Sequence, residues 1–279
     1  MQLTVLVDNN TLVDRYFQGE PGISFFIREG ERRILFDTGY SGLFLANARK
    51  MDIDLRRLDW VVLSHGHLDH TWGLDPLIRL FTEAAIEGQS IERPTLLGHP
   101  AVLGSRRIGV LPNIGSALSE EMLSPHFRLR LSREPVWLTE RLVFLGEIPR
   151  TLEFEAVSPM GEVMTREGPK PDLLADDSAL AYRSRDGLVL ITGCAHAGIC
   201  NTIEHARRVC GEERVADVIG GFHLLAPPLE RLEETVRRLE ALDLHSLHPC
   251  HCTDLSSKVA LTRRLPVEEV GVGLRLEYL

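Results

Sequence analysis

The sequence predicts an α/β protein, an αββα sandwich in which two mixed β-sheets face each other and helices cover the outside. Short apolar runs with strand character dominate the first forty residues, and further on such runs alternate with stretches of helical period. Neither a linker nor an internal repeat divides the 279 residues. We therefore expect a single domain over residues 1–279, with a variable insertion at about 101–150, where Gly, Pro, Ser and Arg interrupt short apolar runs.

The first half of the chain is predicted to begin with strands. Apolar runs separated by turn signals, such as Pro21-Gly22 and Gly30, are typical of strands joined by tight turns. The run after Gly73 has the length and composition of a helix instead. The expected elements are strands over 5–7, 23–27 and 33–36, a helix over 43–50, a strand over 60–63, a helix from 73 to about 85, and a strand over 96–100.

In the second half, residues 188–191 form a continuous apolar run, which is typical of a central strand buried on both faces. The helix expected after it carries Ile199, Ile203 and Ala206 on one face and ends at Gly211. The remaining expected elements are strands over 178–182 and 215–219, an amphipathic helix over 229–242, a strand unit ending at 247–253, and a closing edge strand over 270–276.

The stretch SHGHLDH, residues 64–70, is the strongest chemical signal in the chain. It lies between the strand predicted over 60–63 and the following helix, so a rigid scaffold would present it. Imidazole and carboxylate are the ligands that zinc and similar metals prefer. Four such ligands are too many for one ion without strain but suit two ions about 3.5–4 Å apart. The candidate ligands are His65, His67, Asp69 and His70.

Two metal ions need further ligands, and three later strand ends each offer a histidine: His196, His223 and His251. We expect at least two of the three to bind metal. Cys194 precedes His196 by two residues, so an extended loop would direct both side chains inward. The same alternation implies that Cys250 and Cys252 do not both face the metals if His251 does.

The motif at 64–70 resembles the HxHxDH signature of the metallo-β-lactamase superfamily, and this resemblance implies that fold. It also implies roles for other residues. Asp37, in the FDTG stretch, stands where members carry an acid that orients the metal loop. His251 fits the place of the last ligand histidine, and Cys194 stands where a ligand acid is usual. The histidine that usually precedes the central strand has no clear match: Asp176 or Asp177 stands nearest, and His196 would replace it.

Further stretches extend the resemblance over nearly the whole chain. In order they are LVDN, FDTG, SHGHLDHTWGL, GEIPR, DDSALAY, GLVLITGCAHAGICN, GGFHL and HCT. Together they resemble the branch of the superfamily that includes a dihydropterin-type transferase of pterin cofactor biosynthesis. Trp72 and Asp254 stand where that branch usually has glycine, and Glu20-Pro21-Gly22 replaces a more typical Glu-His-Gly.

Bulk properties limit the partners. The formal net charge of −9 favours no nucleic-acid partner. No apolar run approaches the roughly 20 residues that span a bilayer, so we expect no membrane partner. The five cysteines, an odd number, and a start without a basic leader predict reduced thiols in the cytoplasm. The expected partner is a small molecule with an anionic group, because the helix after Gly198 would direct its positive N-terminal end toward the site.

These observations predict a binuclear-metal-dependent enzyme, a hydrolase or transferase acting on a phosphorylated or ester-type small molecule. Zinc is the expected metal, with iron or manganese as alternatives. Asp69 and His223 are the candidate catalytic groups. A dihydropterin-type transferase is the first alternative function. An iron-binding redox module is the second, although the chain has no Cys-x-x-Cys motif.

Overall fold

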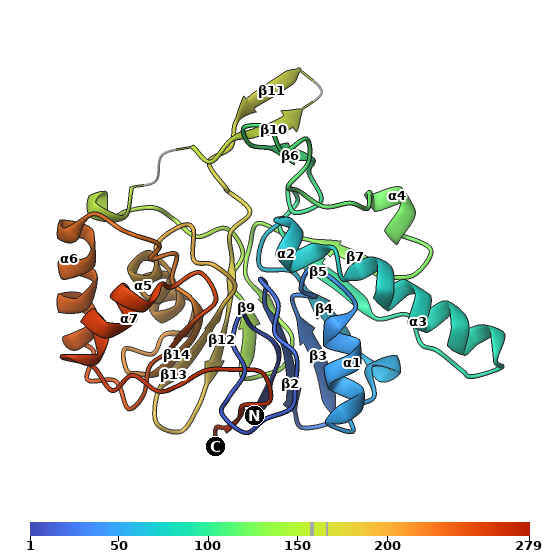
Figure 1. Cartoon of the computed structure of the whole chain (residues 1–279), viewed down its shortest axis with the longest axis horizontal. Coiled ribbons are helices and arrows are strands. Elements are labelled where there is room, and N and C mark those ends of the chain that lie inside the picture. The colour runs from blue at the N-terminus through green and yellow to red at the C-terminus, as the bar shows by residue number, and fades with distance from the viewer. Residues whose placement is uncertain (157–158, 166) are drawn as a thin grey trace.

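The computed structural model, which describes residues 1–156, 159–165 and 167–279, has the predicted αββα architecture. Two sheets pack face to face in the middle of the molecule, with α1 and α3 outside one sheet and α5, α6 and α7 outside the other (Figure 1). The helices are α1 (Leu43–Lys50), α2 (Leu68–Thr71), α3 (Leu74–Ile86), α4 (Glu120–Leu123), α5 (Ile199–Cys210), α6 (Leu229–Glu240) and α7 (Leu255–Thr262), with short 3-10 turns η1 (Leu55–Arg57) and η2 (Glu153–Glu155).

The first sheet has seven strands in the order β16-β1-β2-β3-β4-β5-β7. Strands β1, β2 and β3 pair antiparallel, whereas β3, β4, β5 and β7 run parallel. The bounds are β1 (Gln2–Val7), β2 (Ser24–Glu29), β3 (Arg32–Phe36), β4 (Trp60–Val62), β5 (Thr95–Gly98), β7 (Arg128–Leu131) and β16 (Arg275–Glu277). The closing strand is therefore shorter than the predicted 270–276.

The second sheet has six strands in the order β15-β14-β13-β12-β9-β8. Strands β13, β14 and β15 are parallel, so their carboxyl ends lie at one edge of the sheet. The bounds are β8 (Val136–Trp137), β9 (Leu142–Phe144), β12 (Ala179–Arg183), β13 (Leu188–Thr192), β14 (Val215–Gly221) and β15 (His248–Cys250). In open sheets of this kind, ligands bind beyond the carboxyl ends of the strands.

The space between the sheets is filled by apolar side chains that alternate along the strands. Phe25 and Phe36 from the first sheet meet Phe144, Val189 and Ile191 from the second, and all are fully buried. Each sheet also has one apolar cluster on its outer face, between the sheet and the helices that cover it. Because both faces of each sheet are covered, residues 188–191 had to be apolar throughout, as observed.

Residues 101–150, expected as one insertion over the site, divide into two parts. The first part contributes β6 (Arg106–Arg107) to a small sheet with β10 (Glu162–Thr165) and β11 (Gly168–Pro171). This small sheet and the described loops joining it, residues 101–118, 159–165 and 167–172, project from one end of the sandwich and are called the cap here (Figure 1). The second part supplies β7, β8 and β9 to the main sheets, because its apolar runs are needed to complete them.

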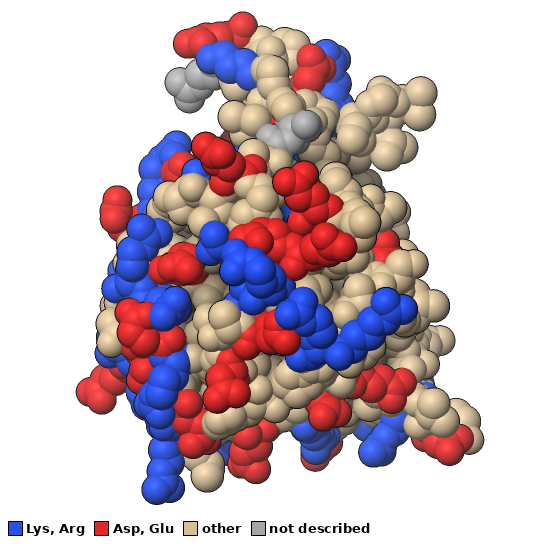
Figure 2. Space-filling model, turned by 90° about the vertical axis from the view of Figure 1, so that its left-hand side faces the viewer, with Lys and Arg blue, Asp and Glu red and all other residues tan. Residues whose placement is uncertain are grey.

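The outer helices have the expected amphipathic character. On α6, Val236 and Leu239 are buried, and Glu234 pairs with Arg237 and Arg238 on the exposed side. Figure 2 shows acidic and basic side chains interspersed over the face that contains these helices. Within the described residues, no helix is both long and apolar enough to cross a membrane.

Candidate metal centre

The loop after β4 is held in place by the side chain of Asp37, at the end of β3. Oδ1 of Asp37 accepts a hydrogen bond from the amide of Ser64 at 2.7 Å, and Oδ2 accepts one from the Ser64 hydroxyl at 2.6 Å. The Ser64 hydroxyl also lies 3.0 Å from Nδ1 of His65. The turn formed by Asp37, with φ of 55°, thus fixes the start of the histidine-rich loop.

A second carboxylate supports the middle of the same loop. The amide of Gly66 donates to Oδ2 of Asp176 at 2.8 Å, and the buried guanidinium of Arg106 binds the same oxygen at 2.7 Å. A Cβ atom at Gly66 would lie 2.2 Å from the backbone carbonyl oxygen of Val102 and 2.0 Å from Nη1 of Arg106, so only glycine fits here. This contact joins the cap, which carries Arg106, to the loop that carries the candidate ligands.

The first group of possible metal donors consists of His65, Cys194 and His196, whose ligand atoms all lie within 4.8 Å of one another. His67 adjoins this group, because its Nδ1 lies 3.0 Å from Nε2 of His65 and its ring centroid lies 5.0 Å from that of His196. All four residues are buried.

The second group consists of His70, Cys194 and His251, again with ligand atoms within 4.8 Å. Asp69 adjoins it: its Oδ2 lies 3.4 Å from Nε2 of His251 and 3.8 Å from Nε2 of His70. Cys194 belongs to both groups, and its Sγ lies 3.4 Å from Nε2 of His70. The predicted site residues therefore meet in one place, as two donor groups that share a thiol.

Several of the donor atoms lack a hydrogen-bond partner within the described part of the site, which suits metal binding. Among the described residues, Nε2 of His67 and both ring nitrogens of His196 are buried without a hydrogen-bond partner. Leaving buried polar atoms unpaired costs about 1–3 kcal/mol each. Imidazole nitrogen and thiolate sulfur are ligands for zinc and for other transition metals. Binding of a divalent ion would satisfy Nε2 of His67 and one ring nitrogen of His196.

Ring protonation in the site follows from burial and nearby charge. Burial lowers the pKa values of His65 and His196 well below the usual range, so these rings are neutral and free to bind metal. Burial also acts to lower the pKa of His70, but the carboxylates of Asp69 and Asp37 outweigh it and raise that pKa to about 9. Burial raises the pKa of the Cys194 thiol well above its usual value.

His223 follows β14 and lies beside the first group. Its ring centroid is 4.2 Å from that of His196, and its Nδ1 has no hydrogen-bond partner within the described part of the chain. It belongs to neither group of donors that lie within 4.8 Å. The approach of Gly221 to Gly193, where a Cβ atom would lie 2.4 Å from the Gly193 carbonyl, sets this loop against the one that carries Cys194.

The turn at 250–252 differs from the expected alternation. His251 has φ of 50°, so the chain is not extended there. Cys250 packs into the core between the sheets, whereas Cys252 turns toward Cys194 and lies 3.5 Å from its carbonyl oxygen. As predicted, Cys250 and Cys252 do not both face the site. They do not point away from it together, however, because the chain turns at His251. All five cysteines are free thiols.

Two residues that sequence analysis did not single out hold His251. The amide of His251 donates to Oδ1 of Asp8 at 2.9 Å, and its Nδ1 lies 2.9 Å from Oδ1 of Asn9. Both follow β1, about 240 positions away in the chain. The LVDN stretch could have indicated this role, because its polar pair Asp8-Asn9 directly follows a buried strand and therefore lies at the end of the sheet, where functional loops gather.

The expected anion site at the start of α5 is absent from the described residues. The amides of Cys200 and Asn201 donate to the carboxylate of Glu155 at 2.8 and 2.7 Å. The amide of Ala197 donates to Oδ2 of Asp177 at 2.8 Å, and burial raises the pKa of Asp177 to about 7. The helix terminus that we expected to attract a substrate anion is thus occupied by carboxylates of the protein itself.

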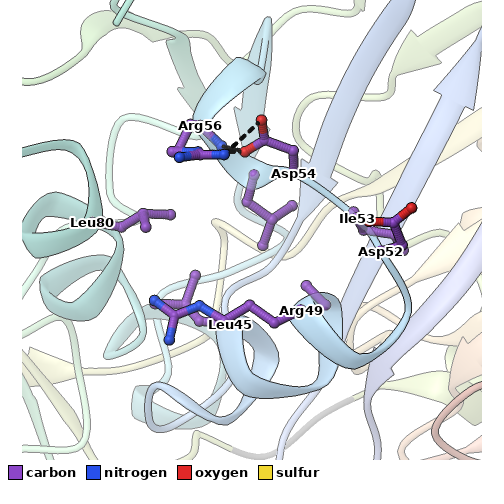
Figure 3. A pocket seen from close by; sticks show the side chains of 9 residues that line it. Leu45, Arg49, Asp52, Ile53, Asp54, Arg56 and Leu80 are labelled. Atoms are coloured by element: carbon purple, nitrogen blue, oxygen red, sulfur yellow. Dashed lines mark hydrogen bonds and ion pairs between the residues drawn. The ribbon is translucent and has the colours of Figure 1, made fainter. Parts of the chain in front are cut away.

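A hollow of about 300 Å³ lies away from the candidate centre, between α1, η1 and α3 (Figure 3). In it, Arg56 pairs with Asp54 at 2.8 Å, while Leu45 and Leu80 supply apolar walls. None of the candidate metal donors is among the described residues that line it. This hollow is separate from the candidate centre.

The chain is similar to known proteins over most of its length. Residues 18–251 match the family model of the metallo-β-lactamase superfamily. The chain is 29% identical over 255 residues to the 7,8-dihydropterin-6-methyl-4-(β-D-ribofuranosyl)-aminobenzene-5'-phosphate synthase of Methanocaldococcus jannaschii, covering 87% of this chain and 84% of that protein. It is also 29% identical over 267 residues to an uncharacterised protein of the same organism, covering 94% of both.

Solved structures give the same fold. Tm1679, described as a metal-dependent hydrolase of the β-lactamase superfamily, superposes with a TM-score of 0.82 at 28% identity, covering 99% of this chain and 98% of that one. The metallo-β-lactamase fold protein YhfI of Bacillus subtilis superposes with a TM-score of 0.61 at 13% identity, covering 99% and 98%. The second similarity concerns the fold alone.

Proposed function

The chain belongs to the metallo-β-lactamase superfamily, and from that membership we propose that it is an enzyme that uses two divalent metal ions to act on a phosphorylated or ester-type small molecule. Zinc is the metal we propose first, with iron or manganese as alternatives. The observation that supports two ions is the position of Cys194, whose sulfur belongs to both donor groups. A shared ligand between two sets of imidazoles suits a pair of ions a short distance apart.

We assign His65, His67 and His196 to one ion, and Asp69, His70 and His251 to the other, with Cys194 between them. When bound, such ions supply Lewis-acid chemistry that activates a water or neutralises a leaving group. Asp37 orients His70 through the 2.7 Å contact to Nδ1 and so directs Nε2 toward the centre. Asp69 reaches both His70 and His251 and is placed to accept a proton from the attacking group.

We propose that His223 donates a proton to the leaving group. Its Nδ1 is unpaired within the described residues and lies beside the first donor group, so it has a hydrogen bond to give or accept. A general acid must reach the atom that it protonates, and a side chain next to the donors, but outside both groups, meets that need.

A dihydropterin-type transferase is the second candidate. It is supported by the 29% identity to a synthase whose name contains a dihydropterin and an aminobenzene phosphate. Hydrolase and transferase differ in what attacks, a water or an acceptor molecule, and both need the same donor groups. The proposed anionic group of the substrate would be bound by the metals, since α5 offers it no free amides at Cys200 and Asn201.

The function is tested by assaying metal-loaded protein against phosphate diesters, pyrophosphates, lactones, and a pterin pyrophosphate with an aminobenzene acceptor. We expect turnover of at least one class, its loss on chelation, and its return on adding zinc or manganese. Asp69→Asn and His223→Gln should both lower kcat. Turnover that survives complete metal removal would contradict the proposal. An iron content without any such turnover would favour the redox alternative.

A further inference from the structure

A pocket of about 390 Å³ opens directly beside the candidate centre, and two of the proposed ligands, His67 and Asp69, line it. Its other walls come from separate parts of the chain. Pro21 lies in the loop before β2, and Tyr40 lies in the loop after β3. Leu68 begins α2, and the cap contributes Ile108, Ile114 and Met160. A group bound here would therefore lie next to the metals.

We propose that this pocket binds an uncharged, planar ring of the substrate, stacked on Tyr40. The inference rests on the proposed function, because the ring would be the part of the substrate that carries the phosphate or ester. Asp69 supplies the one formal charge among the described residues that line the pocket, and it faces the metal donors His70 and His251. The remaining walls favour an apolar ligand surface.

The case for a flat ring comes from Tyr40. Its ring stacks on that of Trp72, with centroids 5.3 Å apart and planes 22° from parallel. One face of Tyr40 is therefore covered, while 44% of the residue remains exposed. An aromatic ring that is supported from behind and open in front binds another ring by stacking.

Hydrogen bonds hold the stacked pair of Tyr40 and Trp72, and the cap wall beside it, in place. Nε1 of Trp72 donates to the carbonyl oxygen of Gly115 in the cap at 2.8 Å. The amide of Leu68 donates to the carbonyl oxygen of Ile114 at 2.9 Å, and the amide of Ile114 donates to the backbone carbonyl oxygen of Arg106 at 2.8 Å. These bonds tie the cap wall to the metal loop. The pocket is thus formed before ligand binds, which reduces the ordering cost of binding.

The test measures binding of two uncharged alcohols, 2-naphthylmethanol and cyclohexylmethanol, to the metal-loaded full chain by calorimetry. Neither probe has a phosphate or ester, so binding does not depend on turnover. We expect the naphthyl probe to bind more tightly than the cyclohexyl one. Tyr40→Ala should weaken the naphthyl probe about two- to tenfold, as expected for the loss of one aromatic pair. Tyr40→Phe should keep its affinity.

Tyr16→Ala is the matched control, because Tyr16 is 88% exposed and does not line this pocket; it should leave binding unchanged. Equal affinity for the two probes, or full affinity in Tyr40→Ala, would overturn the proposal even if the protein binds metal and turns over a phosphate. Ring binding in a protein that holds no metal would contradict the proposed function instead. The two failures are therefore distinguishable.

Discussion

Nδ1 of His70 lies 2.7 Å from Oδ2 of Asp37, and both side chains are fully buried. The same carboxylate accepts both hydrogen bonds from Ser64, at the start of the metal loop. Asp37 therefore fixes the ring of His70 and the backbone of the loop together. With Nδ1 facing Asp37, Nε2 faces Asp69 and Cys194. A carboxylate that orients an imidazole in this way sets which nitrogen is free for metal.

Asp37→Asn should weaken metal affinity about 10–100-fold, because one of the two acceptor oxygens becomes an NH2 group, and either the Ser64 amide or the His70 ring then loses its acceptor. Competition with a chromogenic chelator measures this affinity. Asp75→Asn is the control: Asp75 pairs with Arg79 on the exposed side of α3 and should leave the affinity unchanged. If Asp37→Asn kept full affinity, Asp37 would serve only to shape the turn.

Cys194→Ser should abolish the sulfur-to-metal charge-transfer absorption of cobalt-substituted protein. Cys194 is the cysteine that belongs to both donor groups, and a serine hydroxyl gives no such transition. Cys210→Ser is the matched control, since Cys210 is buried in the cluster under α5. Retention of the band in Cys194→Ser, or its loss in Cys210→Ser, would rule out the proposed ligand.

Arg106→Met should lower the free energy of unfolding by about 3–5 kcal/mol, the usual cost of removing one partner from a buried ion pair. Arg106 is 1% exposed and binds Asp172 at 2.8 Å and Asp176 at 2.7 Å. Arg107→Met changes a neighbouring but exposed pair with Glu162 and should cost less than about 1 kcal/mol. Denaturant titration of metal-free protein measures the free energy of unfolding of both variants. Equal losses would show that Arg106 does not join the cap to the loop.

Glu155→Ala should lower the free energy of unfolding by about 1–3 kcal/mol, because it leaves the amides of Cys200 and Asn201 buried and unpaired. Glu155 is 1% exposed. Glu153→Ala, in the same 3-10 turn, provides the comparison. A stability equal to that of the parent would mean that these two hydrogen bonds do not stabilise the start of α5.

Much of the candidate site could be predicted because its signal is local. Residues 65–70 carry four ligand-type side chains beside a strand, and that pattern needs no knowledge of distant contacts. His196 and His251 were found from their places after predicted strands. The carboxyl ends of β13, β14 and β15 lie at one edge, so the histidines converge.

The supporting residues could not be predicted in the same way. Arg106 lies in a segment rich in Gly and Pro, and its partners Asp172 and Asp176 are more than sixty positions away. Asp8 meets His251 only because the first and second sheets pack together. The occupied end of α5 depends on Glu155, whose 3-10 turn has no distinctive sequence pattern. These contacts are set by tertiary packing rather than by local sequence.

Cys194 lies in both donor groups, and we propose that the chain holds two metal ions there. Elemental analysis of protein purified without chelator tests it most directly, with the His67→Ala variant analysed in parallel. We expect two divalent ions per chain in the parent protein and a clear loss of bound metal in the variant, because an imidazole donor next to the first group is removed. A parent protein without transition metal would contradict the presence of a metal centre, and a variant with undiminished metal content would contradict a role for His67 in it.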